Sequence, residues 1–539
     1  MRQQLFLDGT HIGPYWDKPL GRGASCRDRV AEFVAGLKDC HNVYIILSTD
    51  AASYLDGVSS TVPDGWELLI IEDLDTHAVL SEMASRSQSD VLSLYAPADA
   101  PFLDAVLADR IIQLHVEYAA EYTFADGYPQ GLAVEVLSHR AFSGLSARAA
   151  DVAGFDSRRL LFSVAETDIN SFDIDTYISP VDARMMRAAF YADTRRRFVA
   201  CDRLAGKLPD LSGVAVSGAD ACMADRIAQE VVTNPGFLRT TPAFVQIEIT
   251  TRTRQRPVYL PYDLLGDLWP GARAPNGAQE GTAAPSIAEP AEGFDMPLDS
   301  VGSLLAQLEE LESDLVICPS QFGEPSFHPQ FEDIARLILA HPDRRLLVET
   351  SGIGWEREML QRVDQIAPER IEWVVCLDSQ NPQAYRRIRG DGLQEAMACV
   401  EQLIELAGER VYVQATRLSG YEKELEEMYR FWKERGDRLI IQKHNDYNGR
   451  IESRKVSDLS PVQRFACWHL RRDIVIRQDG TYAMCAQDLD GREGPGHTLS
   501  DGASVSALWD AQSRKFTEHA QGTYEGLCAN CDEYYTFNF

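Results

Sequence analysis

The chain has 539 residues, of which 45% are hydrophobic and 25% charged. This is the composition of a folded globular protein, and the length suffices for about three or four domains. The formal net charge of −30 argues against nucleic acid as a main partner, because phosphate binding needs a basic surface. No apolar run approaches the length of a membrane span and the first residues do not form a secretory signal, so we expect a cytoplasmic protein with no membrane partner.

The first part of the chain, residues 1–155, has the pattern of a doubly wound α/β sheet. Apolar runs at 43–47 and 91–95 have the length of buried parallel strands, and helical periodicity lies before and between them. Asp99 closely follows the second run. Ligands of open α/β sheets bind at the carboxyl ends of the strands, so Asp99 is a candidate ligand of a Mg²⁺–nucleotide. A plain turn carboxylate is the other interpretation.

Two motifs in this part resemble those of the sugar-nucleotide cytidylyltransferases of the spore-coat-polysaccharide type. They are Asp99-Ala100-Pro101-Phe102-Leu103-Asp104 and Tyr128-Pro129-Gln130-Gly131-Leu132-Ala133-Val134-Glu135-Val136. The resemblance implies that Asp99 binds the metal and that Lys18 follows the nucleotide loop. However, the segment 6–14 has no arginine or serine and few glycines with which to hold a triphosphate. We therefore expect a nucleotidyltransferase-like (Rossmann-like) domain, with an active sugar-phosphate cytidylyltransferase as the alternative.

Residues 156–240 predict a mostly helical connector, and residues 241–450 then alternate strands with helices. Six apolar runs separated by helical periodicity occupy 244–249, 315–318, 346–349, 373–377, 411–414 and 439–442. Six βα units predict a parallel sheet that forms a partial (βα)6 barrel, with any site at the carboxyl ends of its strands. Residues 268–293 are rich in Ala, Pro, Gly and Glu, so we expect an exposed, flexible insertion there.

Motifs at these strand ends resemble a radical-SAM domain. They are Phe322-Gly323-Glu324-Pro325 with His328-Pro329, then Glu349-Thr350-Ser351-Gly352, then Leu377-Asp378-Ser379 followed by Tyr385 and Arg389-Gly390. The resemblance implies that Gly323, Glu324 and Pro325 contact the methionyl amino group of S-adenosylmethionine. A retained turn that binds no ligand is the other interpretation.

The iron-binding cysteines of that family are missing from their place. In the family register, their three positions fall on Thr253, Pro257 and Leu260. Proline and leucine have no donor atom, and a threonine hydroxyl is too hard and too weakly acidic to bind iron. Without this cluster the chain should not cleave S-adenosylmethionine reductively, unless a partner chain supplies a cluster. Whether S-adenosylmethionine binds at all is left open by the sequence.

The last part of the chain, residues 451–539, contains four cysteines at metal-ligand spacings. Cys467 precedes and Cys485 follows a predicted strand–turn–strand hairpin around Gly480, and Cys528 and Cys531 form a C-x-x-C pair. Four thiolates at such spacings suit an iron–sulfur cluster or zinc. Buried cysteines without a metal and a disulfide are the alternatives.

This pattern, with Gln487-Asp488 and Ala507-Leu508-Trp509 downstream, resembles the cysteine-rich SPASM domain of radical-SAM maturases. The resemblance implies one 4Fe-4S cluster on Cys467, Cys485, Cys528 and Cys531, with zinc as the second choice of metal. The domain order is similar to that of spiro-SPASM proteins, a family defined by its architecture. We expect a cluster-binding protein without radical chemistry, with a structural, electron-transfer, or peptide- or small-molecule-binding role. A peptide or protein substrate and a redox partner are the partners that this implies, and whether the chain is an enzyme stays open.

Overall fold

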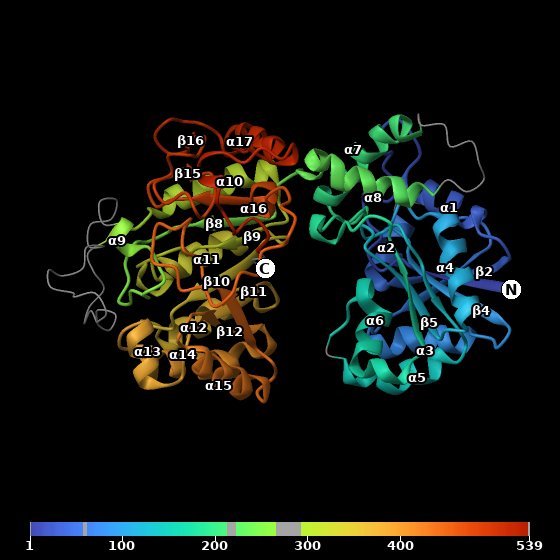
Figure 1. The fold of residues 1–539 in the computed structure, drawn as a ribbon, viewed down its shortest axis with the longest axis horizontal. Helices are drawn as coiled ribbons and strands as arrows, with labels where there is room; N and C mark the ends of the chain where they lie inside the picture. Colours follow the sequence, from blue (N-terminus) through green and yellow to red (C-terminus); the bar gives the residue numbers. More distant parts are fainter. Residues whose placement is uncertain (1, 58–61, 153, 213–221, 266–292, 537–539) are drawn as a thin grey trace. The chain divides into compact units, whose positions relative to one another are not determined.

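The computed structural model describes residues 2–57, 62–152, 154–212, 222–265 and 293–536. The predicted insertion at 268–293 therefore lies outside the described residues, except for Gly293. The chain divides into two compact units, unit 1 (Met1–Thr240) and unit 2 (Thr241–Phe539). Both are mixed α/β structures, each built on one large sheet (Figure 1).

The sheet of unit 1 has seven strands in the order β3-β2-β1-β4-β6-β5-β7. Its strands are β1 (Arg2–Asp8), β2 (Cys40–Ser48), β3 (Trp66–Ile71), β4 (Val91–Pro97), β5 (Tyr122–Asp126), β6 (Glu135–Leu137) and β7 (Ile174–Ile178). The first four strands pair in parallel, and β6 runs antiparallel to both of its neighbours. The two predicted strands are present as β2 and β4. Strand β7, however, comes from the segment predicted as a helical connector and pairs with β5.

The helices of unit 1 begin at side chains that cap them. Ser25 and Asp28 form a capping box at the start of α1, and the Asp104 carboxylate accepts the first free N–H groups of α4. The helices are α1 (Cys26–Gly36), α2 (Thr49–Gly57), α3 (Thr76–Arg86), α4 (Ala105–Tyr118), α5 (Ala141–Arg148), α6 (Leu160–Ala165), α7 (Arg195–Ser212) and α8 (Met223–Thr233). Side chains of α3, α5 and α6 form one buried core with Phe6 of β1 and Ile46 of β2.

The sheet of unit 2 has nine strands in the order β13-β12-β11-β10-β9-β8-β14-β15-β16. The strands are β8 (Phe244–Ile247), β9 (Val316–Cys318), β10 (Arg345–Thr350), β11 (Ile371–Cys376), β12 (Val411–Arg417), β13 (Leu439–Lys443), β14 (Asp473–Ile476), β15 (Thr481–Ala483) and β16 (Gly496–His497). All six strands predicted from apolar runs are present, and they lie side by side in parallel and in chain order. The predicted hairpin is confirmed as the antiparallel pair β14–β15. Strand β14 also pairs in parallel with β8.

Alternate residues of the central strands point to opposite faces of this sheet. On one face, Val348, Val375 and Val413 pack in a large core with α10, α11 and α14, and each buried side chain of this size stabilises the fold by about 1.5–3 kcal/mol. On the other face, the intervening Leu347 and Val374 belong to a separate small cluster. The helices of unit 2 are α9 (Tyr262–Leu265), α10 (Leu298–Leu311), α11 (Phe331–Leu339), α12 (Arg357–Asp364), α13 (Pro382–Ile388), α14 (Leu393–Ala407), α15 (Glu422–Lys433), α16 (Trp468–Arg472) and α17 (Val505–Ala520).

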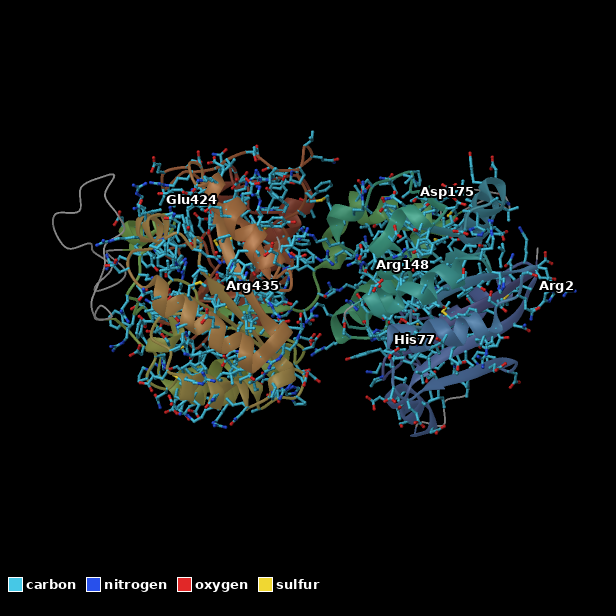
Figure 2. All side chains as sticks on the ribbon, turned by 90° about the horizontal axis from the view of Figure 1, so that it is seen from below. Arg2, His77, Arg148, Asp175, Glu424 and Arg435 are labelled. Carbon is cyan, nitrogen blue, oxygen red and sulfur yellow. The ribbon has the colours of Figure 1, made fainter. Side chains whose placement is uncertain are left out.

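Figure 2 shows the described side chains on the ribbon, with Arg2 at the start of β1 and Glu424 in α15 among those labelled. Among the described residues, no helix has the length and apolar composition needed to cross a membrane.

Glu248, the residue after β8, gives unit 2 a pH-dependent stability. Its side chain is fully buried, and burial raises the pKa of its carboxyl from 4.5 to about 7, an effect that the nearby Arg477 partly offsets. The folded protein therefore keeps this proton at pH values where the unfolded chain has lost it, so stability falls as the pH rises from about 4.5 to 7. Between pH 5 and pH 8, the free energy of unfolding should therefore fall by about 3 kcal/mol less in Glu248→Gln than in the unmutated protein. Urea unfolding at the two pH values measures this difference.

The matched control is Glu401→Gln, at an exposed position of α14, which should leave the pH dependence unchanged. An identical pH dependence in the Glu248→Gln variant and the unmutated protein would contradict this account.

Candidate ligand cavity and cysteine cluster

A cavity of about 270 Å³ lies over the second face of the sheet of unit 2. Polar side chains from five parallel strands line it: Gln246 of β8, Glu349 of β10, Cys376 of β11, Gln414 of β12 and Gln442 of β13. Four of the five lie at or next to the carboxyl ends of their strands, and Gln414 lies at the middle of β12. The carboxyl ends are where parallel sheets form their ligand sites. The sequence analysis did not single out four of them as functional, because each stands inside or next to an apolar run. The signal was a polar residue inside or at the end of the apolar run of each of these five strands.

The cavity brings together residues from three separate predicted motifs. Thr253, Pro257 and Leu260 line it, and so do Gly323 and Glu324, together with Cys467, Cys485 and Cys531. Pro325 and Cys528 are not among the lining residues. Residues more than 200 positions apart in the chain thus share one cavity, which makes it the candidate functional site of unit 2.

Hydrogen bonds hold the loop that follows β8. The Gln255 side chain donates to the hydroxyl of Tyr385 (2.8 Å) and accepts from Arg389 Nε (3.1 Å). The Tyr259 hydroxyl donates to Asp378 (2.7 Å), which also forms a buried ion pair with Arg389 (2.6 Å). The loop that carries Thr253, Pro257 and Leu260 therefore needs no metal to keep its shape. Gln255 and Tyr259 were missed by sequence analysis because their partners lie more than 100 residues away.

Glu324 is buried and fully engaged by the chain itself. Its carboxylate accepts hydrogen bonds from the Thr350 hydroxyl (2.6 Å) and from both the backbone N–H (2.7 Å) and the hydroxyl of Ser351. Burial raises the pKa of Glu324, and these hydrogen bonds lower it in part. At Gly323 a Cβ atom would lie 1.9 Å from the carbonyl oxygen of Thr250. The Gly-Glu turn is thus required for packing, whether or not a ligand binds there.

The four C-terminal cysteines form one neighbourhood. Cys467 and Cys528 belong to a small buried cluster with Cys485 packed against it, and the Cys531 thiol lies close enough to influence the ionisation of Cys467 and Cys485. Arg464 fixes the C-x-x-C turn by donating to the carbonyl oxygens of Cys528 and Ala529.

Burial raises the pKa of all four thiols, that of Cys531 to about 11. Neighbouring thiols raise the pKa of Cys467 and Cys485 further, so a bound cation would be needed to ionise them together. All eleven cysteines are free thiols. Among the described residues, no three His, Cys, Asp or Glu side chains are already arranged to hold a metal ion. The donor set therefore fits a thiolate-bound metal in chemistry and location, and the thiols would have to adjust on binding it.

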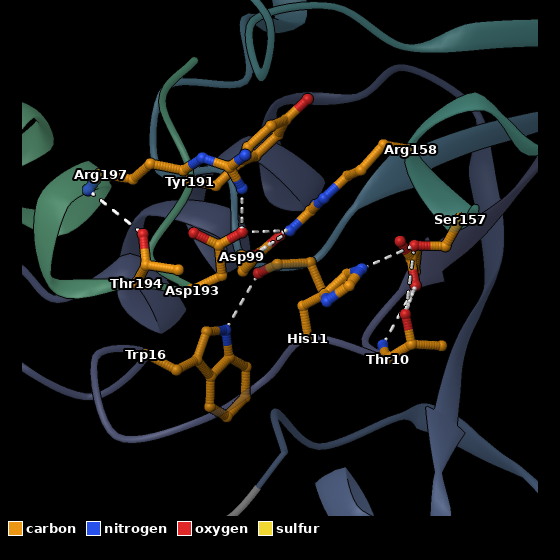
Figure 3. A network of polar contacts seen from close by, with 12 residues as sticks. Thr10, His11, Trp16, Asp99, Ser157, Arg158, Tyr191, Asp193, Thr194 and Arg197 are labelled. Carbon is orange, nitrogen blue, oxygen red and sulfur yellow. Dashed lines mark hydrogen bonds and ion pairs between the residues drawn. The ribbon is translucent and has the colours of Figure 1, made fainter. Parts of the chain in front are cut away.

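In unit 1, an arginine occupies the surroundings of Asp99 (Figure 3). Asp99 is fully buried just after β4, and the guanidinium of Arg158 donates to both of its carboxylate oxygens (2.7 and 2.5 Å). The same guanidinium donates to Asp193 (3.2 Å) and stacks on the ring of Tyr191 (3.8 Å to its centroid). Both oxygens of Asp99 are thus already bound to a cation that belongs to the chain.

Lys18 is exposed, with its ammonium 4.3 Å from the centre of the Tyr15 ring. No hydrogen bond or ion pair joins Lys18 to Asp99 in the part of unit 1 that the structure describes. A nucleotide site on these two residues remains a prediction, and it would require Asp99 to leave Arg158.

No protein-family model matches the chain. A protein of Treponema pallidum (strain Nichols), described as an uncharacterized protein, is 31% identical over 392 residues, which cover 70% of this chain and 98% of that protein. The chain belongs to the same family as this protein. Because 70% of the chain is more than either unit contains, the alignment includes residues of both units. A second uncharacterized Treponema pallidum protein is 28% identical over 138 residues, covering 23% of this chain and 63% of that protein.

Three solved structures illustrate the fold comparison. The anSMEcpe protein with bound AdoMet matches with a TM-score of 0.37 and 12% identity, over 51% of this chain and 79% of that one. Streptococcus suis SuiB bound to precursor peptide SuiA has a TM-score of 0.39 and 10% identity, over 61% and 82%. A cytidylyltransferase from Leptospira borgpetersenii serovar Hardjo-bovis has a TM-score of 0.33 and 12% identity, over 44% and 95%.

Removing Arg158 should destabilise unit 1 strongly, because Asp99 would remain buried without a counter-charge. We expect Arg158→Met to lower the free energy of unfolding by about 3–5 kcal/mol, and the added change Asp99→Asn to restore most of it. Urea unfolding of the full chain measures both.

The neighbouring Arg159→Met is the control. Arg159 pairs with Glu166, and both side chains are largely exposed, so its loss should cost less than about 1 kcal/mol. Equal losses in the two single variants would contradict a structural role for the Asp99–Arg158 pair.

Proposed function

We propose that unit 2 is a ligand-binding module in which an iron–sulfur cluster forms part of the cavity wall. One observation carries this proposal: Cys467, Cys485 and Cys531 line the same cavity as the strand residues Glu349 and Gln414. A metal that was purely structural could be enclosed in the C-terminal segment. Here three of the four thiols face the space that a ligand would occupy.

The proposed ligands of the cluster are Cys467, Cys485, Cys528 and Cys531. Four soft thiolates suit a 4Fe-4S cluster, and zinc is the second choice. When bound, such a cluster supplies structural support or the transfer of single electrons. The chain contributes the surroundings: Arg464 holds the C-x-x-C turn, and the backbone N–H of Glu533 donates to the sulfur of Cys531 (3.4 Å).

A radical-generating cluster is not part of the proposal. Thr253, Pro257 and Leu260 offer iron no suitable donor atom, and Gln255, Tyr259 and Arg389 hold the loop together instead. The cavity, at about 270 Å³, has room for a small molecule or for one side chain of a peptide. A peptide or protein substrate and a redox partner therefore remain the proposed partners.

Metal and acid-labile sulfide content tests the proposal. Protein purified without oxygen should contain about four irons and four sulfides per chain and give an EPR signal after reduction. Cys528→Ala/Cys531→Ala should lose both the iron and the signal, whereas Cys40→Ala, at a half-buried thiol of unit 1, should keep them. A content of one zinc per chain without sulfide would show that the four cysteines bind zinc and not an iron–sulfur cluster. No metal in any preparation would refute the proposal.

Reduction in the presence of S-adenosylmethionine should yield no 5′-deoxyadenosine, because the loop after β8 has no thiolates. The assay is run on the pure protein and on a lysate, since a partner chain could supply a cluster only in the lysate. Formation of 5′-deoxyadenosine in either sample, and not in a lysate without the protein, would show that radical chemistry is retained.

A further inference from the structure

The arginine and the lysine that line the cavity already have anionic partners in the chain. Arg389 is paired with Asp378 (2.6 Å), and Lys443 is paired with Asp532 (2.8 Å) and Glu533 (2.6 Å). Neither group is available to neutralise a further charge in the cavity.

Glu349 is the lining carboxylate with an unused oxygen. Its Oε1 accepts from the Gln414 side chain (3.2 Å) and from the Cys376 thiol (3.5 Å). No hydrogen bond to Oε2 and no ion pair of Glu349 occurs among the described residues. Burial raises the pKa of its carboxyl, and the residue is half-buried, so part of its surface stays exposed. Since it lines the cavity, that remaining exposed surface faces the cavity.

The C-terminal part of the cavity wall also offers an unused acceptor. Gln487, two residues after Cys485, is only 6% exposed, and its side-chain Oε1 has no hydrogen-bond partner in the described chain. Gln487 and Glu349 both line the cavity. A buried acceptor without a donor costs free energy, so the cavity favours a ligand that brings N–H groups.

We propose that the cavity binds a small cationic ligand, a primary ammonium or guanidinium compound, whose N–H groups donate to Oε2 of Glu349. This inference rests on the proposed binding function of the cavity and names its ligand class. A cluster held by four thiolates carries net negative charge and would add to the preference for a cation. The carboxamides of Gln246, Gln442 and Gln487 are placed to bind the polar remainder of such a ligand.

Three probes of similar size and different charge test this inference: propylammonium, 1-propanol and propionate. Their binding to the anaerobically purified full chain is measured by ligand-observed NMR titration. We expect propylammonium to bind and the other two to bind more weakly. Glu349→Gln keeps an acceptor for Gln414 but replaces Oε2 by an N–H₂ donor, and should weaken propylammonium binding about tenfold or more.

Two further variants keep the test decisive. Glu356→Gln, at an exposed position before α12, should bind propylammonium as the unmutated chain does. Glu349→Asp, which keeps the charge, should bind better than Glu349→Gln, and thermal unfolding verifies that each variant is folded.

Equal affinity of the unmutated chain and Glu349→Gln for propylammonium would overturn the inference. Preferred binding of propionate or 1-propanol would also overturn it, but would leave the cavity as a binding site. If none of the probes binds, both the ligand class and the binding role of the cavity are refuted. The titration is repeated with Cys528→Ala/Cys531→Ala, so that loss of the metal is distinguished from loss of the carboxylate contact.

Discussion

The arrangement of unit 2 depends on the parallel pairing of β14 with β8. Asp473 stands opposite Phe244 in this pair, and the backbone bonds from Ala243 N–H to Arg472 O (2.8 Å) and from Glu248 N–H to Ile476 O (2.9 Å) extend the pairing at both ends. Cys467 lies just before α16, which leads directly into β14, and Cys485 lies just after β15. This pairing fixes β14 next to the six parallel strands. It thereby places Cys467 and Cys485, which flank the β14–β15 segment, at the cavity above the sheet.

Both units hold a polar network at a position that the sequence analysis compared with the metal site of a resembling family. In unit 2, Gln255, Tyr259 and Arg389 hold the loop after β8. In unit 1, the guanidinium of Arg158 binds both oxygens of Asp99. In each case a side chain of the protein supplies hydrogen bonds or positive charge permanently, whereas a metal can be bound or lost. The C-terminal thiols differ from both places, because they lie close to one another and each is a possible metal ligand.

Much of the fold followed from local patterns. The six parallel strands and the hairpin at Gly480 are apolar runs and a turn signal, which depend on neighbouring residues only. The pairing of β14 with β8 and of β7 with β5 was not predictable in this way, since the partners are far apart in the chain. The same limit applied to the cavity. Gln414 and Gln442 become neighbours only in the sheet (3.1 Å between their amides), and Arg158 reaches Asp99 across 59 positions of sequence.

The β8–β14 pairing also orders the events by which unit 2 is assembled. Strand β8 is the first strand of unit 2 to be synthesised. Its partner β14 is synthesised more than 200 residues later. Until then, the growing chain has an open sheet edge, a feature that invites incorrect strand pairing. The two cysteines of the C-x-x-C turn, Cys528 and Cys531, follow all nine strands of this sheet in the chain. The proposed metal site is therefore complete only after every strand of this sheet has been synthesised.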